Sequence, residues 1–201
     1  MLAPRSGDDA AELSDIELLA RTVAGDRPAF GQLVVRHQAA VARFARAASL
    51  TSADAEDVLQ ETFLAALRGA GSFRGASAVR TWLLAITRHA ALQRRRRDQR
   101  YESTGEDSLE ALGRGAGWGA EPPATPEQAM IGAERRADVA RALESLPPDQ
   151  REILVLRDGE GLSGEETATV LGVSLDAMKS RLHRARLKLA ASLRRGEHNG
   201  T

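Results

Sequence analysis

The chain has 201 residues, with 28 basic and 28 acidic side chains, no cysteine and few aromatic residues. The zero net charge points to no particular partner, and the lack of cysteine excludes disulfides and thiol chemistry. No apolar run is long enough for a membrane-spanning helix, and the N-terminus lacks the apolar core of a signal peptide. We therefore expect a soluble, cytoplasmic protein with no membrane insertion.

Four helices are expected in the first hundred residues. A capping box of Ser14 and Glu17 opens a short first helix, and Pro28 lies near the start of the second. The third should run from about 52 to 68, and the fourth should begin around Ser77. Apolar spacing predicts the buried residues of this half: Phe30, Leu33, Val34, His37, Val41, Phe44, Val58, Leu59, Phe63, Ala66, Leu67, Val79, Leu83 and Ile86.

The third helix carries an acidic stripe. Asp54, Asp57 and Glu61 fall on one side of it, with Gln60 and Leu64 beside them. Taken alone, this pattern is typical of a solvated helix whose negative charge near the N-terminus is favoured by the helix dipole. Paired carboxylates also occur in metal and acid–base sites, but no histidine joins them and no nucleophile is apparent. We therefore expect no catalytic residue, no metal ligand and no cofactor.

The start of the fourth helix combines an aromatic residue, a glycine-containing loop and several arginines. Such a segment, from 72 to 89, can stack unpaired bases on Trp82 while its arginines follow the phosphate backbone. The alternative is that Trp82 is simply a core residue, and the sequence favours that alternative over direct stacking. The arginine run at 94–97 is typical of a solvated helix end, although it adds to any attraction for phosphate.

Helical periodicity fails between about 98 and 127. This stretch is acidic, with a glycine-rich run at 113–119 and three prolines after it. Such a composition is typical of a flexible linker. Because no strand alternation is found elsewhere, the sequence predicts an all-α fold of two small helical domains, at 13–97 and 128–195, joined by a flexible acidic linker.

The second domain should contain a helix-turn-helix. Pro147 and Pro148 should separate its first two helices, and a capping box of Ser163 and Glu166 then opens a short helix that ends at the turn 172–174. Two helices joined by a short turn with glycine form the motif that places its second helix in the major groove of DNA. Its core should contain Leu143, Leu146, Ile153, Leu154, Leu156, Leu175, Met178, Leu182, Ala185 and Leu189.

The last helix should have one apolar and one basic side. The basic side contains Ser180, His183, Arg184 and Leu187, flanked by Lys179, Arg181, Arg186 and Lys188. Arg184 and Lys179 suit the paired acceptors of guanine or a phosphate, whereas the flanking residues should hold phosphates. The alternative for an isolated basic amphipathic helix is a solvated surface that binds nothing. The alternative for His183 is likewise an ordinary surface residue.

These segments, in this order, resemble the extracytoplasmic-function sigma factors of bacterial RNA polymerase. The resemblance covers roughly 13–97 and 130–193. Its motifs are Asp-x-Glu-Asp-x-x-Gln-Glu-x-Phe at 54–63, Phe-Arg-Gly at 73–75, Thr-Trp-Leu at 81–83 and Lys-Ser-Arg-Leu-x-Arg-Ala-Arg at 179–186. The resemblance implies a promoter-specificity subunit, not an enzyme, that binds core polymerase and helps to melt promoter DNA.

The resemblance also assigns each motif a partner. It implies that the clamp of the largest polymerase subunit is bound by Asp54, Asp57, Gln60, Glu61 and Leu64. It implies that the minus-ten element is bound by Phe73, Arg74, Ser77, Arg80, Trp82, Arg88 and His89. It implies that the minus-thirty-five element is bound by Lys179, Ser180, Arg181, His183, Arg184, Arg186 and Lys188. The polymerase flap and an anti-sigma factor are further implied partners, and the linker would pass near the polymerase active site.

Three positions depart from the family pattern. His89 stands where asparagine is usual, Val79 stands where an aromatic residue is common, and His183 occupies a variable position. These departures concern which promoter is recognised rather than the class of protein.

Two other functions stay open on the residues alone. The helix-turn-helix could belong to a self-sufficient repressor or activator, with the first domain used for dimerisation or sensing. Alternatively, the chain could be a helical adapter that sequesters another regulator and makes no use of the basic helix for DNA. The first alternative predicts tight operator binding by the chain alone, and the second predicts no DNA requirement for Lys179, Ser180 or Arg184.

Overall fold

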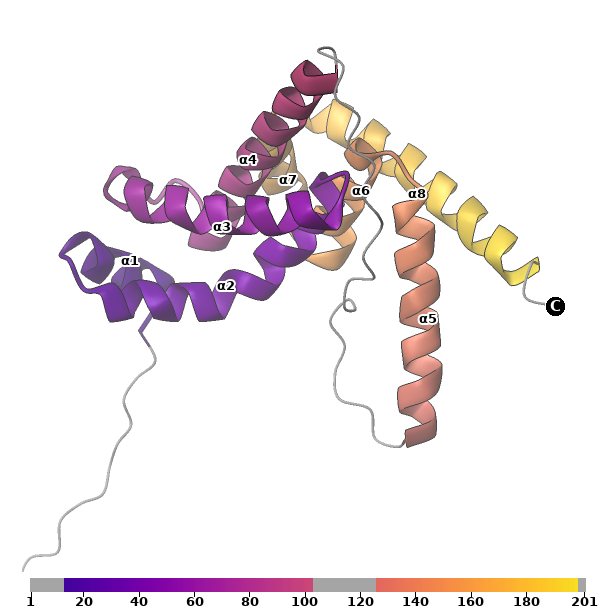
Figure 1. The fold of residues 1–201 in the computed structure, drawn as a ribbon, viewed down its shortest axis with the longest axis horizontal. Coiled ribbons are helices and arrows are strands. Elements are labelled where there is room, and N and C mark those ends of the chain that lie inside the picture. Colours follow the sequence, from indigo (N-terminus) through magenta and orange to yellow (C-terminus); the bar gives the residue numbers. More distant parts are fainter. Residues whose placement is uncertain (1–12, 103–125, 199–201) are drawn as a thin grey trace, which may run out of the picture.

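Every regular element in the described residues, 13–102 and 126–198 of the computed structural model, is helical. The α-helices are α1 (Asp15–Val23), α2 (Arg27–Ala48), α3 (Ser52–Gly69), α4 (Val79–Glu102), α5 (Pro126–Glu144), α6 (Pro148–Leu154), α7 (Gly164–Leu171) and α8 (Leu175–His198). A short 3-10 helix, Ala70–Ser72, follows α3, and a π-helical turn, Val155–Gly159, follows α6. The all-α prediction is confirmed (Figure 1).

Both predicted capping boxes open helices. The Ser14 hydroxyl accepts the Glu17 amide at 3.3 Å, and the Glu17 carboxylate accepts the Ser14 amide at 2.8 Å. Ser163 and Glu166 form the same reciprocal pair at the start of α7. Each box satisfies amide groups that have no partner within the helix, so the helix begins at a defined residue.

The segment predicted as a linker is partly helical. α4 continues to Glu102, so the predicted start of the linker at 98 is wrong. α5 begins at Pro126, one residue before the predicted end of the linker at 127. The reason is local: no glycine or proline precedes Gly105 in this stretch, and Asp98 lies 3.6 Å from Arg94 one helical turn earlier. The remaining part of the predicted linker, 103–125, lies outside the described residues.

The first four helices share a core of leucine, valine and alanine. Leu18, Leu33, Val41 and Leu83 are buried there, as the helical spacing of the first half predicts for the last three. Leu67 differs from its prediction, because it remains 44% exposed. α3 contacts both α2 and α4, and Leu67 lines an open groove with Phe30 and Val34 of α2 instead of entering the core.

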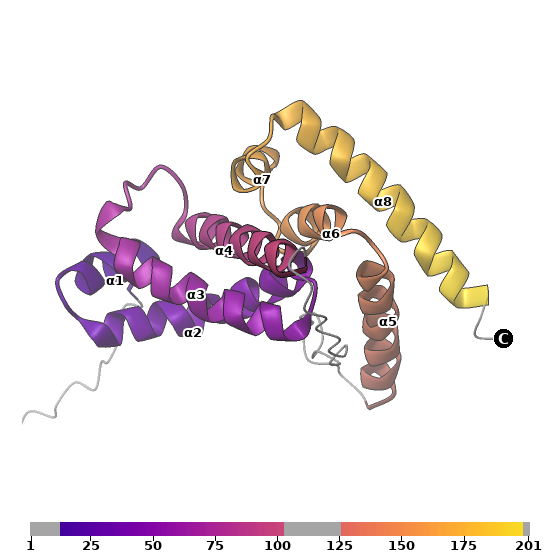
Figure 2. The same ribbon diagram turned by 45° about the horizontal axis from the view of Figure 1, so that its top comes forward.

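The two halves of the chain are packed against each other. Phe44 of α2 and Leu84 of α4 are fully buried in the cluster that also contains Ile153, Leu156 and Met178 of the second half. Figure 2 shows α6 and α7 lying between α4 and α8. Burying a large apolar side chain contributes about 1.5–3 kcal/mol, so this contact stabilises the packed arrangement substantially.

Two glycines determine the geometry of the helix-turn-helix. Gly172 ends α7 in the left-handed conformation, with φ of 57° and ψ of 41°, which a residue with a Cβ adopts only under strain. Gly164 begins α7 against α8, where an added Cβ would lie 3.1 Å from Leu175 and 3.2 Å from Met178. The left-handed turn therefore requires glycine at 172, and the close approach of α7 to α8 favours the smallest residue at 164.

Replacing Gly172 by alanine should lower the free energy of unfolding by about 1 kcal/mol, because alanine is strained in the left-handed region. Gly31 provides the matched control: it lies inside α2 with no atom within 4 Å of an added Cβ. Gly31→Ala should instead stabilise the protein by up to about 1 kcal/mol, because alanine is the better helix former. Urea unfolding followed by circular dichroism measures both, and equal effects of the two substitutions would contradict the role given to Gly172.

Candidate functional site

The outward side of α8 is a continuous basic surface. α8 packs on the core through Met178, Leu182 and Ala185, which are buried, so the opposite side faces solvent. Among the predicted DNA-binding residues of this helix, only Arg181 is half-buried. The others are exposed: Lys179, Ser180, His183, Arg184, Arg186 and Lys188. Leu187, which the helical spacing places on the same side, is 58% exposed.

Two basic side chains of this surface lie close to carboxylates. Arg186 forms two hydrogen bonds with Asp158, with its Nε lying 3.0 Å from Oδ2. The hydrogen bond that Arg186 donates to Asp158 raises the pKa of its guanidinium. Lys179 lies 3.9 Å from Asp176, an exposed contact that contributes little. Arg186 is thus oriented by the protein, whereas Lys179 keeps its freedom to reach a DNA base or phosphate.

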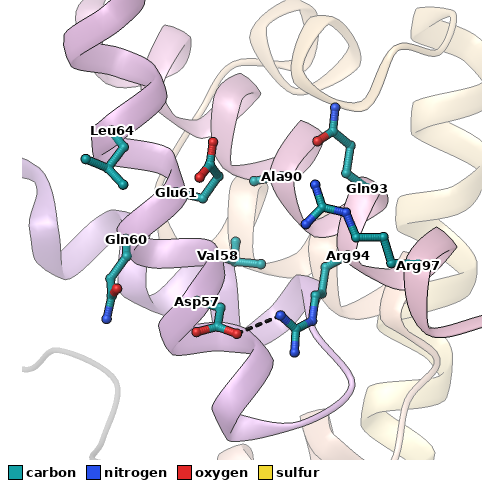
Figure 3. Close-up of a pocket in the computed structure, with 9 residues that line it drawn as sticks. All are labelled: Asp57, Val58, Gln60, Glu61, Leu64, Ala90, Gln93, Arg94 and Arg97. Atoms are coloured by element: carbon teal, nitrogen blue, oxygen red, sulfur yellow. Dashed lines mark hydrogen bonds and ion pairs between the residues drawn. The ribbon is translucent and has the colours of Figure 1, made fainter. Parts of the chain in front are cut away.

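The acidic stripe of α3 lines a pocket, shown in Figure 3. Asp57, Gln60, Glu61 and Leu64 form one wall, and α4 supplies the other wall through Gln93, Arg94 and Arg97. The pocket has a volume of about 220 Å³ and opens to solvent. Its α3 wall offers two carboxylates, an amide and an apolar side chain on one accessible surface, and we call the pocket the acidic pocket after this wall.

The charges of this acidic pocket are arranged in local pairs. Arg94 donates a hydrogen bond to Asp57 at 2.7 Å, and Arg68 reaches Glu61 at the same distance. Asp57 and Glu61 are both about half exposed, so these pairs are weak and can be exchanged for a partner. Asp54 differs from them, because its carboxylate is turned inward, where it accepts the Thr51 hydroxyl at 2.7 Å.

Sequence reasoning missed the second wall of this pocket and an apolar groove beside it. The arginines at 94–97 were expected to be a solvated helix end, yet Arg94 pairs with both Asp54 and Asp57 across α3 and α4. The groove, of about 410 Å³, is lined mainly by Phe30, Val34, Leu59, Phe63, Leu64 and Leu67. The groove could have been predicted from the apolar stripe on α3, because this stripe is wider than one neighbouring helix can cover.

The residues predicted for the minus-ten element fall into separate groups. Phe73 and Trp82 contact each other with ring centroids 5.2 Å apart, and both are half-buried against the first core. Arg74 lies exposed in the loop and Ser77 is half-buried there. His89 is exposed on α4, where its ring nitrogen lies 2.7 Å from the Gln93 amide nitrogen. Trp82 therefore packs against the core, which is the alternative that the sequence favours, and the rest of its surface remains accessible to solvent.

Arg80 and Arg88 face the second half of the chain. Arg80 donates a hydrogen bond to Glu160, and Arg88 lies 3.5 Å from Glu152. A third contact joins the same surfaces, since the Thr81 hydroxyl donates to Glu166 at 2.8 Å. Hydrogen bonds from the Ser163 amide and then from Thr81 lower the pKa of the Glu166 carboxyl.

Within the ranges 13–102 and 126–198, no group of histidine, cysteine and acidic residues has the arrangement of a metal site. Nor does any helix in these ranges have the length and apolar character needed to cross a membrane. The surfaces described above are suited to binding anionic and basic macromolecular partners through charge, amide groups and apolar contact.

Comparison with known proteins finds two family models that match separate parts of the chain. Residues 33–101 match the family model "Sigma-70 region 2", and residues 136–189 match "Sigma-70, region 4". The chain is 43% identical over 182 residues to the ECF RNA polymerase sigma factor SigM of Mycobacterium tuberculosis, a match that covers 90% of this chain and 86% of the relative. It is 38% identical over 176 residues to the ECF RNA polymerase sigma-E factor of Escherichia coli, covering 87% and 92% of the two chains.

Two solved structures have the same fold over most of the chain. The sigma factor RpoE, solved with the anti-sigma factor NepR from Bartonella quintana, gives a TM-score of 0.65 at 29% identity and covers 82% of this chain and 96% of its own. CnrH, solved with the cytosolic domain of CnrY, gives a TM-score of 0.58 at 31% identity and covers 89% and 96% of the two chains.

Proposed function

The chain belongs to the extracytoplasmic-function family of RNA polymerase sigma factors, and from this membership we propose how its surfaces divide the work of transcription initiation. As a member of this family, it directs RNA polymerase to specific promoters. Sigma factors are initiation factors rather than catalysts, and we assign the chain no reaction of its own. The proposal concerns which residues contact which partner.

The domain at 128–195 is proposed to recognise the minus-thirty-five element. α8 would enter the major groove, with Lys179, Ser180, His183 and Arg184 directed to bases and the flanking basic residues directed to phosphates. The exposed basic side of α8, on a helix that a glycine turn holds against α7, supports this assignment. Since phosphate contacts release counterions, promoter binding should weaken steeply as salt increases.

The domain at 13–97 is proposed to bind both polymerase and the minus-ten element. The acidic pocket of α3 would dock on the polymerase clamp, with Asp57, Gln60 and Glu61 at its centre. The loop before α4, together with Trp82 and the arginines of α4, would bind a base taken out of the stack and the melted strand. Unstacking a base costs a few kcal/mol, which contacts in this loop must offset.

We further propose that the protein acts in the cytoplasm, where the polymerase works, and that an anti-sigma factor regulates it. The similarity to RpoE, whose structure contains the anti-sigma factor NepR, supports such a partner. The apolar groove on α2 and α3 and the acidic pocket beside it are exposed surfaces to which such a protein could bind.

One observation carries the proposed function: a single chain joins an accessible acidic helical pocket to an exposed basic recognition helix, in the order of the two sigma-70 regions. Run-off transcription with purified core polymerase, with and without the chain, tests it. We expect promoter-dependent transcripts only when the chain is present. Tight operator binding by the chain alone, without stimulation of transcription, would support a repressor instead, and inhibition independent of the basic helix would support an adapter.

A further inference from the structure

The contact between the two halves is polar as well as apolar. α6, α7 and the π-helical turn pack on α2 and α4, and we call this arrangement the closed state. Besides the apolar cluster around Phe44 and Leu84, it contains ion pairs from two carboxylates of the second half, Glu152 and Glu160. Both carboxylates bind arginines of the first half.

Glu160 binds two arginines at once. Its carboxylate accepts Nε of Arg43 at 2.6 Å and a terminal guanidinium nitrogen of the same residue at 3.1 Å, and it also accepts a hydrogen bond from Arg80. The Glu160 side chain is fully buried, whereas the side chains of Arg43 and Arg80 are 24% and 38% exposed. Burial alone would raise the pKa of Glu160, but the hydrogen bonds and charges of Arg43 and Arg80 hold it below its usual value.

Glu152 forms a second, equally buried centre. Its side chain is 2% exposed, and its two carboxylate oxygens bind Arg95 and Arg88, with the latter at 3.5 Å. Because a buried carboxylate without a partner is costly, Glu152 and Glu160 both depend on the first half for their neutralisation.

The arginines bound in the closed state include those proposed to follow the melted DNA strand. A guanidinium binds a carboxylate and a phosphate with the same fork of N–H donors, so the two anions compete for one site. In the closed state Glu160 occupies Arg80 and Glu152 occupies Arg88. The basic side of α8 is not covered in this way, since Lys179 and Arg184 remain exposed.

The closed state is also too short to contact both promoter elements. Elements centred about 25 base pairs apart are separated by about 85 Å of B-form DNA, at about 3.4 Å per base pair. α8, with 24 residues, is about 36 Å long, and the two halves share one apolar cluster. Promoter binding through both domains therefore requires that the halves separate.

We propose that Glu152 and Glu160 form an intramolecular lock, which holds the free chain closed by occupying with carboxylates the arginines that DNA phosphates bind in the open state. This inference rests on the proposed function, because it uses the assignment of Arg80 and Arg88 to the melted strand. The lock inhibits the first domain without any second protein. It leaves the minus-thirty-five surface free.

The test measures opening directly in the full chain. Since the sequence has no cysteine, Gln32→Cys and Ala190→Cys place a fluorophore pair on exposed positions of α2 and α8 without background labelling. Glu160→Gln removes the charge but keeps the shape of the side chain. Energy transfer should fall, because the equilibrium shifts toward the open state by on the order of 100-fold when a buried ion pair loses one partner.

Two further variants separate opening from misfolding. Arg43→Gln weakens the lock from the other half and should lower energy transfer in the same direction. Asp138→Asn removes an exposed ion pair with Arg141 inside α5 and should leave energy transfer unchanged. Circular dichroism checks that each variant keeps its helices. Unchanged energy transfer in both Glu160→Gln and Arg43→Gln would overturn the lock.

Binding of a labelled single-stranded DNA of mixed sequence tests the competition itself. Glu160→Gln should bind it about ten-fold more tightly than the unsubstituted chain, and adding Arg80→Gln should remove that gain. Opening without tighter DNA binding would overturn the competition between carboxylate and phosphate. Failure of the proposed function has a different signature, since neither the original chain nor Glu160→Gln would then support run-off transcription with core polymerase.

Discussion

Reversing the charge of Asp57 and Glu61 together, by Asp57→Arg and Glu61→Arg, should abolish association of the chain with core RNA polymerase. Both carboxylates are about half exposed in the acidic pocket, where a basic partner can reach them. Central interface residues contribute about 2 kcal/mol or more each, so the double reversal should weaken binding by about 1000-fold or more. Gel filtration of the variant mixed with core polymerase measures the loss.

The double reversal should leave the fold intact. The ion pairs that it breaks, with Arg94 and Arg68, are solvent-exposed and contribute at most about 1 kcal/mol each. A variant with the same change in net charge, Asp138→Arg with Glu144→Arg on α5, serves as the control and should retain most of the binding. A stable complex between core polymerase and the Asp57→Arg, Glu61→Arg variant would refute the assignment of the pocket to the clamp.

Arg184→Ala should reduce discrimination between promoter variants by about 1–3 kcal/mol, the value expected when one bidentate contact to a guanine is lost. The Arg184 side chain is exposed on the outward side of α8, where its Nε donates to the Ser180 carbonyl at 3.3 Å. This hydrogen bond spans one helical turn and leaves other guanidinium nitrogens for DNA. Transcription from a set of promoters substituted one base pair at a time in the minus-thirty-five region measures the change.

Lys188→Ala is the matched comparison on the same helix. As a predicted phosphate contact, Lys188 should affect all promoter variants alike, and its loss should reduce the slope of binding against salt by about one counterion. Arg184→Ala should change the order of preference, whereas Lys188→Ala should not. Unchanged promoter preference in Arg184→Ala would remove the base contact from this residue.

Local signals predicted the helices and several of their ends, with the C-terminal end of α4 as an exception. The capping boxes at Ser14 and Ser163 are short-range patterns, because each satisfies amides within one turn of the same helix. Gly172 is similar, since the left-handed turn that it permits depends on one residue. The spacing of the apolar residues also predicted which side of α8 is buried and which is exposed, because the direction of each side chain is fixed once the helix forms.

Packing between distant segments was not predictable from these patterns. Helical spacing identified Phe44 as buried, but it does not specify the surface that buries the ring, and the structure places the ring against the second half. Glu160 lies between two glycines, a pattern typical of an exposed turn, yet it is a buried ion-pair centre. Asp54 shows the same limit, because a stripe on a helical wheel does not reveal that its carboxylate pairs with Arg94 of α4 at 3.0 Å. Such features depend on partners far away in sequence.

The π-helical turn at Val155–Gly159 fixes which way Glu160 points. The amide of Glu160 donates to the carbonyl of Val155 at 2.7 Å, five residues earlier, so this turn holds one residue more than an α-helical turn. One residue corresponds to about 100° of rotation around a helix axis. A regular α-helix of the same sequence would therefore carry this carboxylate round to a different side, away from Arg43 and Arg80. The extra residue in this turn, and not only the identity of the charged residues, therefore brings Glu160 opposite the arginines of the first half.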